Sequence, residues 1–237
     1  MEDIEAIAAL QDSVRRRLYE YVVEQGREVG RNEAAEAVGV ARTLAAHHLD
    51  KLAEVGLLDS GSRRLTGRSG PGAGRPAKVY SPARAERSVS LPARDYRTAA
   101  ELLAEAAEEA GLDTRLFATA RRRGEADRGS AAPCGNLEEA MGVLAARGYA
   151  PHLESADEDG DGAGPRVVRM RNCPFHAVAE RFPPLVCGMN LALLEGLIGD
   201  GPVAARMDAR PGECCVVLEG SAVLRGSVIL KGSEREL

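Results

Sequence analysis

Residues 41–58, "ARTLAAHHLDKLAEVGLL", carry the pattern of a helix with one apolar side and one polar side. The first side is formed by Leu44, Ala45, His48, Leu49 and Leu52. The second side is formed by Arg42, Thr43, Ala46, His47, Asp50 and Lys51. Gly56 ends the predicted helix before an apolar Leu pair, because glycine readily adopts the conformation that closes a helix.

Two shorter helices are predicted upstream of this stretch. Residues 12–25 begin at a capping Asp12 or Ser13, and residues 31–38 are closed by Gly39. Two short helices, a tight turn and a polar-faced third helix predict a helix-turn-helix, whose outer face suits a DNA major groove. An ordinary three-helix bundle with a solvated face fits the same pattern.

The segment that follows predicts a β-hairpin with a basic tip. Strand-like residues 57–59 and 77–80 flank a loop rich in Gly and Arg. The chain has a net charge of −5, yet residues 61–100 hold nine Arg and Lys against two Asp and Glu. A solvated loop is an alternative interpretation of this segment, but such a loop would not require a near absence of Asp and Glu. The local charge therefore favours a nucleic-acid footprint.

Eight side chains on the third helix and the hairpin are candidates for contacts with phosphates or base edges. They are Arg42, Thr43, His47, Lys51, Arg63, Arg64, Arg75 and Lys78. "HHLDKLAEVGLL" (47–58) followed by "GRPAKVYSPA" (74–83) resembles the winged helix of bacterial ArsR-like regulators. The resemblance implies a homodimer on double-stranded DNA with a palindromic operator, and a His48 that packs rather than reads bases.

Two negative features bear on location. No stretch approaches eighteen consecutive apolar residues, so no membrane association is expected. The N-terminal "MEDIEAIAAL" lacks the basic region of a secretory signal, and we predict a cytoplasmic protein, where structural disulfides are uncommon.

The middle of the chain predicts a dimerisation helix over residues 91–111. Its apolar stripe comprises Tyr96, Ala99, Leu103, Ala106 and Ala110, and Leu102 widens it. Packing within one subunit is the alternative. Residues 115–129 add a basic helix or linker.

The C-terminal part has the predicted order helix, strand, strand, helix, helix, strand, strand, which favours a small α+β sensor domain. The predicted fold is therefore α+β: a winged helix-turn-helix at residues 1–90, a dimerisation helix and linker at 91–130, and a cysteine-containing sensor domain at 131–237.

The chain has five cysteines, and four of them lie between residues 173 and 215 of this sensor domain. Cys173 precedes Pro174 at a predicted strand-to-helix junction, where a helix N-terminus favours thiolate. Cys187 lies just inside the next helix, and a fold-back brings both sulfurs together. Cys214 and Cys215 start a strand, so alternation sends their side chains to opposite faces. The fifth, Cys134, lies on a predicted turn and has no assigned role.

"NCPFHAVAERFPPLVC" (172–187) and "GECCVVL" (212–218) resemble the C-terminal half of SufR-type iron–sulfur repressors. The resemblance places Cys173, Cys187 and Cys214 at ligand positions for an iron–sulfur cluster, with 4Fe–4S favoured. The chain departs from the pattern at Gly201, near a further Cys of some members, and its first Cys interval is one residue longer. A fourth ligand is open among His176, Cys215 and an exogenous group. Three thiolates with His176 also suit a tetrahedral zinc site, and buried inert cysteines are the third alternative.

These features predict a DNA-binding transcriptional regulator and redox sensor controlled by a cluster or other metal. The alternative is the same architecture sensing a small organic ligand or holding structural zinc, with cysteines that are not redox-active. A thiol enzyme using Cys173 and His176 lacks an obvious third orienting group, and we expect no enzymatic activity.

Overall fold

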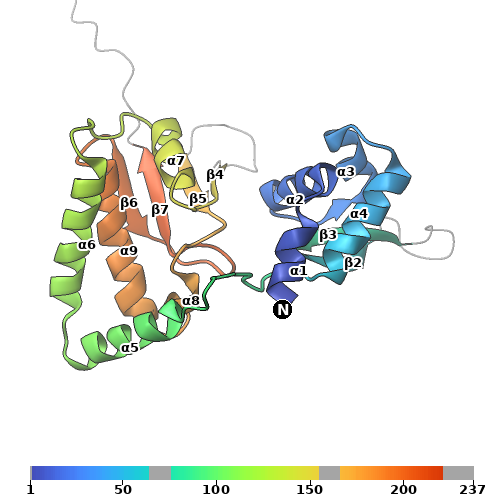
Figure 1. Cartoon of the computed structure of the whole chain (residues 1–237). Coiled ribbons are helices and arrows are strands. Elements are labelled where there is room, and N and C mark those ends of the chain that lie inside the picture. Colours follow the sequence, from blue (N-terminus) through green and yellow to red (C-terminus); the bar gives the residue numbers. More distant parts are fainter. Residues whose placement is uncertain (1, 64–75, 155–165, 221–237) are drawn as a thin grey trace, which may run out of the picture. The chain divides into compact units, whose positions relative to one another are not determined.

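A computed structural model describes residues 2–63, 76–154 and 166–220. The chain divides into two compact units, Met1–Arg94 and Asp95–Leu237. Both units mix helices with a small antiparallel sheet (Figure 1), so the α+β class predicted from the sequence is confirmed.

The first unit packs four helices around a three-stranded sheet. The helices are α1 (Glu2–Ala9), α2 (Ser13–Gln25), α3 (Arg31–Val38) and α4 (Arg42–Glu54). The strands are β1 (Val29–Gly30), β2 (Leu58–Arg63) and β3 (Ala77–Pro82), in the order β1-β3-β2. Strand β1 is an element that the sequence pattern did not predict.

Local signals set the ends of these helices. The Asp12 side chain accepts a hydrogen bond from the backbone N–H of Arg15 and caps α2. Gly26 and Gly39 end α2 and α3 in the left-handed conformation that favours glycine. The helices then bury one apolar cluster whose larger members are Leu18, Val22, Leu49, Leu52 and Tyr80.

The second unit begins with two helices, α5 (Tyr96–Glu109) and α6 (Asp113–Arg128). The elements that follow keep the predicted order. They are α7 (Leu137–Ala145), β4 (Pro151–Glu154), β5 (Val167–Met170), α8 (His176–Ala179), α9 (Pro183–Ile198), β6 (Val203–Met207) and β7 (Val216–Gly220). Helices α5 and α6 thus belong to the same compact unit as the cysteines.

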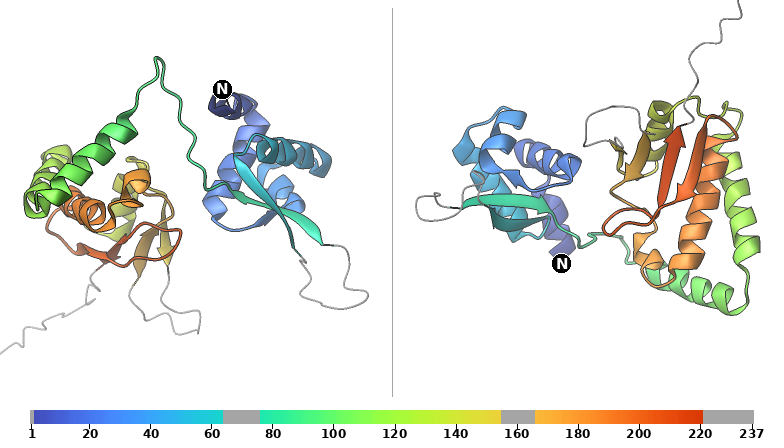
Figure 2. Two further views of the ribbon diagram at one scale, coloured as in Figure 1. Left: turned by 90° about the horizontal axis from the view of Figure 1, so that it is seen from below. Right: turned by 180° about the vertical axis from the view of Figure 1, so that it is seen from behind.

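The four strands form an antiparallel sheet in the order β4-β5-β7-β6. Figure 2 shows α6 and α9 on one side of this sheet. Val168, Met170, Val216 and Leu218 point from the central strands into a core shared with α7 and α9. The opposite face of the sheet holds a buried charged group. Arg169 is only 2% exposed there, and its guanidinium donates hydrogen bonds to Glu154 and Asp208.

Helix α6 lies along α9 at close range because glycines line the contact. A Cβ built on Gly124 would overlap the backbone of α9 at Leu193, and one built on Gly196 would overlap the backbone of α6 at Arg121. A Cβ on Gly188 would meet the ring of Phe117. The absence of side chains at these glycines lets the two helices approach.

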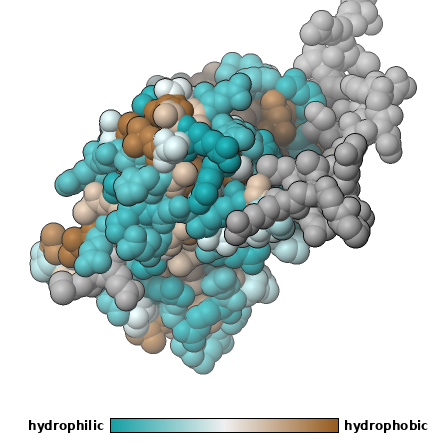
Figure 3. Space-filling model, turned by 90° about the vertical axis from the view of Figure 1, so that its right-hand side faces the viewer, coloured by the Kyte–Doolittle hydropathy of each residue, from teal (hydrophilic) through white to brown (hydrophobic). Residues whose placement is uncertain are grey.

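Helix α5 buries none of its residues fully. Its inner side packs against a second apolar cluster around Phe182, Leu185 and Val186. The stripe predicted from the sequence is exposed along its whole length, from Tyr96 to Ala110. Elsewhere, the face drawn in Figure 3 is mostly hydrophilic, with hydrophobic side chains in small separate patches.

Candidate functional site

Four cysteines reach one region of the second unit from three segments. Cys173 follows β5, Cys187 lies in the second turn of α9, and Cys214 and Cys215 immediately precede β7. Cys187 and Cys214 are buried, while Cys173 and Cys215 are partly exposed. The segment between Cys173 and Cys187 folds back far enough for the two thiols to interact electrostatically.

The four sulfurs form two contacting pairs. Cys187 Sγ lies 3.0 Å from Cys215 Sγ. The Cys173 thiol donates a hydrogen bond to Cys214. The structure therefore brings together the four C-terminal cysteines that the sequence analysis named as candidate metal ligands.

The sulfur of Cys214 is surrounded by hydrogen-bond donors. Besides Cys173, it accepts from the backbone N–H of Val216 and Cys215 and from Asn190 Nδ2 at 3.4 Å. Tyr149 Oη in turn donates to Asn190 Oδ1 at 2.5 Å. Asn190 is 2% exposed, so this chain of polar groups is buried. It holds the amide in the orientation that faces the sulfur.

The surroundings shift the acidity of the thiols in opposite directions. The hydrogen bond from Cys173 and the other donors hold the pKa of Cys214 below its ordinary value, against the effect of burial. Donation to Cys214, together with burial, raises the pKa of the Cys173 thiol. Burial, followed by the contact with Cys215, raises the pKa of Cys187. Thiolate is thus favoured at Cys214 rather than at Cys173, where the sequence predicted it.

Two details of the predicted site differ in the structure. Cys214 and Cys215 precede β7 instead of lying in it, so strand alternation does not apply and both sulfurs join the group. Helix α8 has only four residues, and the backbone N–H of Phe175 is the group that donates to Cys173 sulfur.

His176 is not brought to the sulfurs. Its imidazole is 67% exposed, and its Nε2 lies 3.2 Å from a Glu180 carboxylate oxygen. Only its backbone N–H bonds to the carbonyl of Cys173, at 3.0 Å. Among the alternatives for a fourth ligand, the structure places Cys215 beside the other thiols.

The donor set suits a thiophilic metal in its chemistry. Thiolates are the ligands of zinc and of iron–sulfur clusters, and N–H donors to sulfur are the groups that stabilise such thiolates. Tetrahedral zinc, with Zn–S of about 2.3 Å, spaces its sulfurs about 3.8 Å apart. In the described part of the chain, no three Cys, His, Asp or Glu side chains already surround a point where a metal ion fits. On binding a metal, the thiols would release their protons to solvent, and the sulfurs of each pair would move apart.

Cys134 lies apart from this group. It is 7% exposed, and its carbonyl oxygen faces Gly201 at the other end of α9. Burial is the main cause that raises the pKa of its thiol. The structure gives it a packing position in the core.

The polar side of α4 forms a second candidate surface, in the first unit. Arg42, Thr43 and His47 are exposed, whereas His48 is 6% exposed and packs in the core, as expected. Leu44, predicted on the apolar side, is 41% exposed. The Arg42 side chain is exposed, and no ion pair joins it to another of the described residues.

Three other Arg and Lys residues that were predicted to contact DNA have carboxylate partners. Lys51 Nζ lies 3.1 Å from Glu54, and Arg63 lies 3.4 Å from Glu28. Lys78 Nζ lies 2.6 Å from Asp50. Arg64 and Arg75, also predicted to contact DNA, lie outside the described residues.

Asp50 links α4 to its neighbours. Its carboxylate accepts from Lys78 and Tyr80 of β3, each at 2.6 Å, and from Arg31 of α3 at 2.9 Å. Burial alone would raise the pKa of Asp50, but these donors lower it to about 2. The ionised carboxylate thus fixes the outer side of α4 against both α3 and β3. The sequence placed Asp50 on the polar side without indicating this role.

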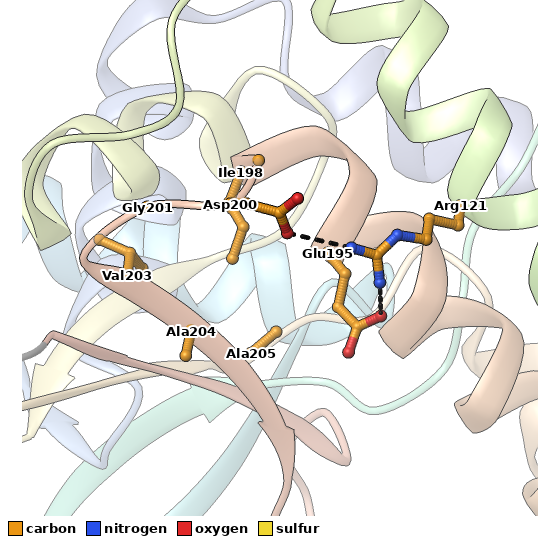
Figure 4. A pocket seen from close by; sticks show the side chains of 9 residues that line it. Arg121, Glu195, Ile198, Asp200, Gly201, Val203, Ala204 and Ala205 are labelled. Carbon is orange, nitrogen blue, oxygen red and sulfur yellow. Dashed lines mark hydrogen bonds and ion pairs between the residues drawn. The ribbon is translucent and has the colours of Figure 1, made fainter.

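An open pocket of about 390 Å³ lies where α9 ends and β6 begins. Figure 4 shows Arg121 in it, between the carboxylates of Glu195 and Asp200 at 2.9 and 3.1 Å. The guanidinium charge is compensated by these two carboxylates. The pocket lies at the opposite end of α9 from Cys187.

Comparisons with known proteins add no assignment to these sites. No family model, no curated protein and no solved structure matches the chain. Within the described residues, every helix is too short or too polar to cross a membrane.

Proposed function

We propose that the protein is a transcriptional regulator with a winged helix-turn-helix, whose affinity for a DNA operator depends on a metal group held by its C-terminal cysteines. An iron–sulfur cluster is the favoured group, with zinc as the alternative. Cys173, Cys187, Cys214 and Cys215 would hold it. When bound, a cluster supplies a redox-sensitive cross-link among these segments, and zinc supplies a stable one.

The DNA-binding proposal is supported by the arrangement of α3 and α4. Residues 39–41 form a three-residue turn between them, and the second helix presents Arg42, Thr43 and His47 outward. Strands β2 and β3 pair over their whole length and form a hairpin beside α4. This geometry suits α4 in a major groove and the hairpin as a wing along the phosphates.

Dimerisation through α5 is supported by an exposed apolar stripe. Tyr96 is 74% exposed and Leu103 73% exposed, although the inner side of the same helix is packed. A second copy of α5 would cover such a stripe. A homodimer would present two α4 helices to the two halves of a palindromic operator.

The observation that carries the regulatory proposal is the packing of the segment between Cys173 and Cys187. This segment contains α8 and the start of α9, and its side chains pack against the inner side of α5 at Ala104 and Ala107, which are partly buried. Arg181 in the same segment forms an ion pair with Glu101 of α5. A group that moves Cys173 and Cys187 would therefore also move the side chains that pack against α5, the proposed dimer helix.

Anaerobic purification followed by visible absorption and assays for iron, sulfide and zinc tests the proposal. Operator binding is then measured with and without the metal group. We expect a bound group and at least a tenfold difference in operator affinity, equivalent to about 1.4 kcal/mol of coupling. A metal-free protein whose DNA affinity is indifferent to iron and zinc would contradict it.

The pocket beside Arg121 favours a second candidate function, regulation by a small organic ligand. It is of a size that holds a small molecule. In that case the cysteines are structural, and Cys187→Ser protein would retain unchanged operator binding under reducing and oxidising conditions. A loss of redox dependence in that variant favours the metal group.

A further inference from the structure

The two thiol pairs differ in how they are held. Cys214 is 3% exposed, and its sulfur already accepts several hydrogen bonds. Cys215 is partly exposed, and its sulfur lies 3.0 Å from Cys187 Sγ. We propose that Cys187 and Cys215 form a reversible disulfide when the metal-free protein meets a hydroperoxide.

The geometry favours this pair over the others. A disulfide has an S–S length of about 2.05 Å, so these two sulfurs need to approach by only about 1 Å. Cys214 and Cys215 are neighbours in the chain, and a bond between them would distort the peptide that joins them. A bond between Cys173 and Cys214 would weaken the hydrogen bonds that the Cys214 sulfur accepts from Asn190 and from the backbone, because a disulfide sulfur is a poorer acceptor than a thiolate.

The reaction needs one equivalent of hydrogen peroxide. The sulfur of Cys215, the more exposed of the pair, attacks one peroxide oxygen, the O–O bond breaks, and a sulfenic acid and water form. The sulfur of Cys187 then attacks the Cys215 sulfur. The S–O bond breaks, and the hydroxyl leaves as water with the proton of Cys187. Two thiols lose two electrons in total, and one peroxide becomes two waters. A small dithiol reverses the bond by exchange.

The bond would have two consequences for the second unit. It ties α9 to the residue immediately before β7, next to Leu185 and Val186, which support α5. It also removes two thiols from the metal site, so the disulfide and a bound metal exclude each other. The effect of the disulfide on metal binding and on α5 rests on the proposed function, whereas formation of the disulfide does not.

Peptide mapping of the full chain tests the proposal. The protein is reduced, freed of metal with a chelator, treated with one equivalent of hydrogen peroxide, alkylated and digested without reduction. We expect free thiols to fall from five to three per chain and one cross-linked peptide pair to contain Cys187 and Cys215. Dithiothreitol should restore all five. Cys134→Ser is the matched control that keeps the cross-link, and Cys215→Ser removes it.

Other products would overturn the inference. These are a bond between Cys173 and Cys214, a bond between Cys214 and Cys215, a bond between two chains, or irreversible oxidation without a bond. Because mapping uses wild-type protein, a variant that fails to fold does not affect this outcome.

A parallel sample, preincubated with zinc, separates the inference from the proposed function. Protection by zinc would support shared use of the two thiols. Equal oxidation with and without zinc would leave the disulfide in place and count against a zinc site at these cysteines.

Discussion

Gly124 of α6 and Gly196 of α9 face each other where the two helices pack together. A Cβ added to Gly124 would lie 3.0 Å from the carbonyl carbon of Gly196 and would overlap the backbone at Leu193. This contact joins α6 to the same helix that carries Cys187.

Gly196→Ala should destabilise the second unit. The added methyl group overlaps backbone atoms of α6, and overpacking of this kind costs about 2 kcal/mol. Chemical denaturation of the full chain, followed by circular dichroism, measures the loss. The matched control is Gly142→Ala in α7, where a Cβ meets nothing within 4 Å. The control should gain about 0.5–1 kcal/mol from helix propensity. Equal stability of both variants would contradict the close contact.

The helix contact also shows what the sequence could and could not predict. Caps such as Asp12 and Gly39 act on neighbouring residues, so helix ends follow from local sequence. The pairing of α6 with α9 is not local, and residues 115–129 looked like a basic helix or linker. The available signal was Gly124 in α6 together with Gly188 and Gly196 in α9.

The candidate site divides in the same way. Fold-back between Cys173 and Cys187 was predicted from their spacing, together with one cysteine of the 214–215 pair. That both Cys214 and Cys215 join depends on where β7 begins. Asn190 was missed, although a single Asn within the apolar run of α9 was a signal for a buried polar role. Lys78 was predicted to contact DNA, but in β3 it lies beside Asp50. This ion pair joins residues that are far apart in the sequence, so local patterns could not indicate it.

The Asp50 contacts predict a pH-dependent stability. The pKa of Asp50 is about 2 in the folded state against 3.8 for an ordinary Asp side chain, because Lys78, Tyr80 and Arg31 donate to it in spite of burial. A lowered pKa means that the contribution is complete above about pH 4 and is lost as the pH falls toward 2. Asp50→Asn should cost about 1 kcal/mol at pH 6, a value reduced for the solvent screening of a side chain that is 44% exposed.

Thermal unfolding of wild type and Asp50→Asn at pH 6 and pH 2.5 measures this difference. The gap between the two melting temperatures should shrink at the lower pH. Asp59→Asn, on the exposed side of β2, serves as the control and should match wild type at both values. A gap that stays constant with pH would show that the charge of Asp50 is not responsible.

The hydrogen bond from Asn190 to Cys214 predicts a role in metal affinity. Asn190→Ala removes a donor to the sulfur, and loss of such a supporting group weakens metal binding by about 10–100-fold. Tyr149→Phe removes only the hydroxyl that orients Asn190 and should have a smaller effect in the same direction. Competition with a chromophoric zinc chelator measures both, and Asn32→Ala, exposed in the first unit, should bind as wild type does.

The exposed stripe of α5 predicts the oligomeric state. Leu103→Glu places a charge in the proposed dimer contact and should convert a dimer to a monomer, since Leu103 is 73% exposed and its loss does not disturb the core. Sedimentation equilibrium measures the mass. Leu91→Glu makes the same substitution at a residue that is 84% exposed outside α5, and it should remain dimeric. A wild type that is already monomeric at high concentration would remove the α5 dimer from the proposal.

DNA binding itself is tested by two arginines with different surroundings. Arg42, at the start of α4 with no described ion-pair partner, is placed to read a base edge, and Arg42→Ala should cost about 1–3 kcal/mol at one base pair in each half-site. Arg63, in β2, is placed to contact phosphate, so Arg63→Ala should weaken all duplexes alike and reduce the salt slope by about 0.9. Fluorescence anisotropy on a selected operator and a scrambled duplex, each over a range of salt, separates the two effects. Because Arg63 already lies 3.4 Å from Glu28, Glu28→Gln should tighten binding to both duplexes. Salt-independent binding by wild type, or equal losses on both duplexes for the Arg42 variant, would refute base reading by α4.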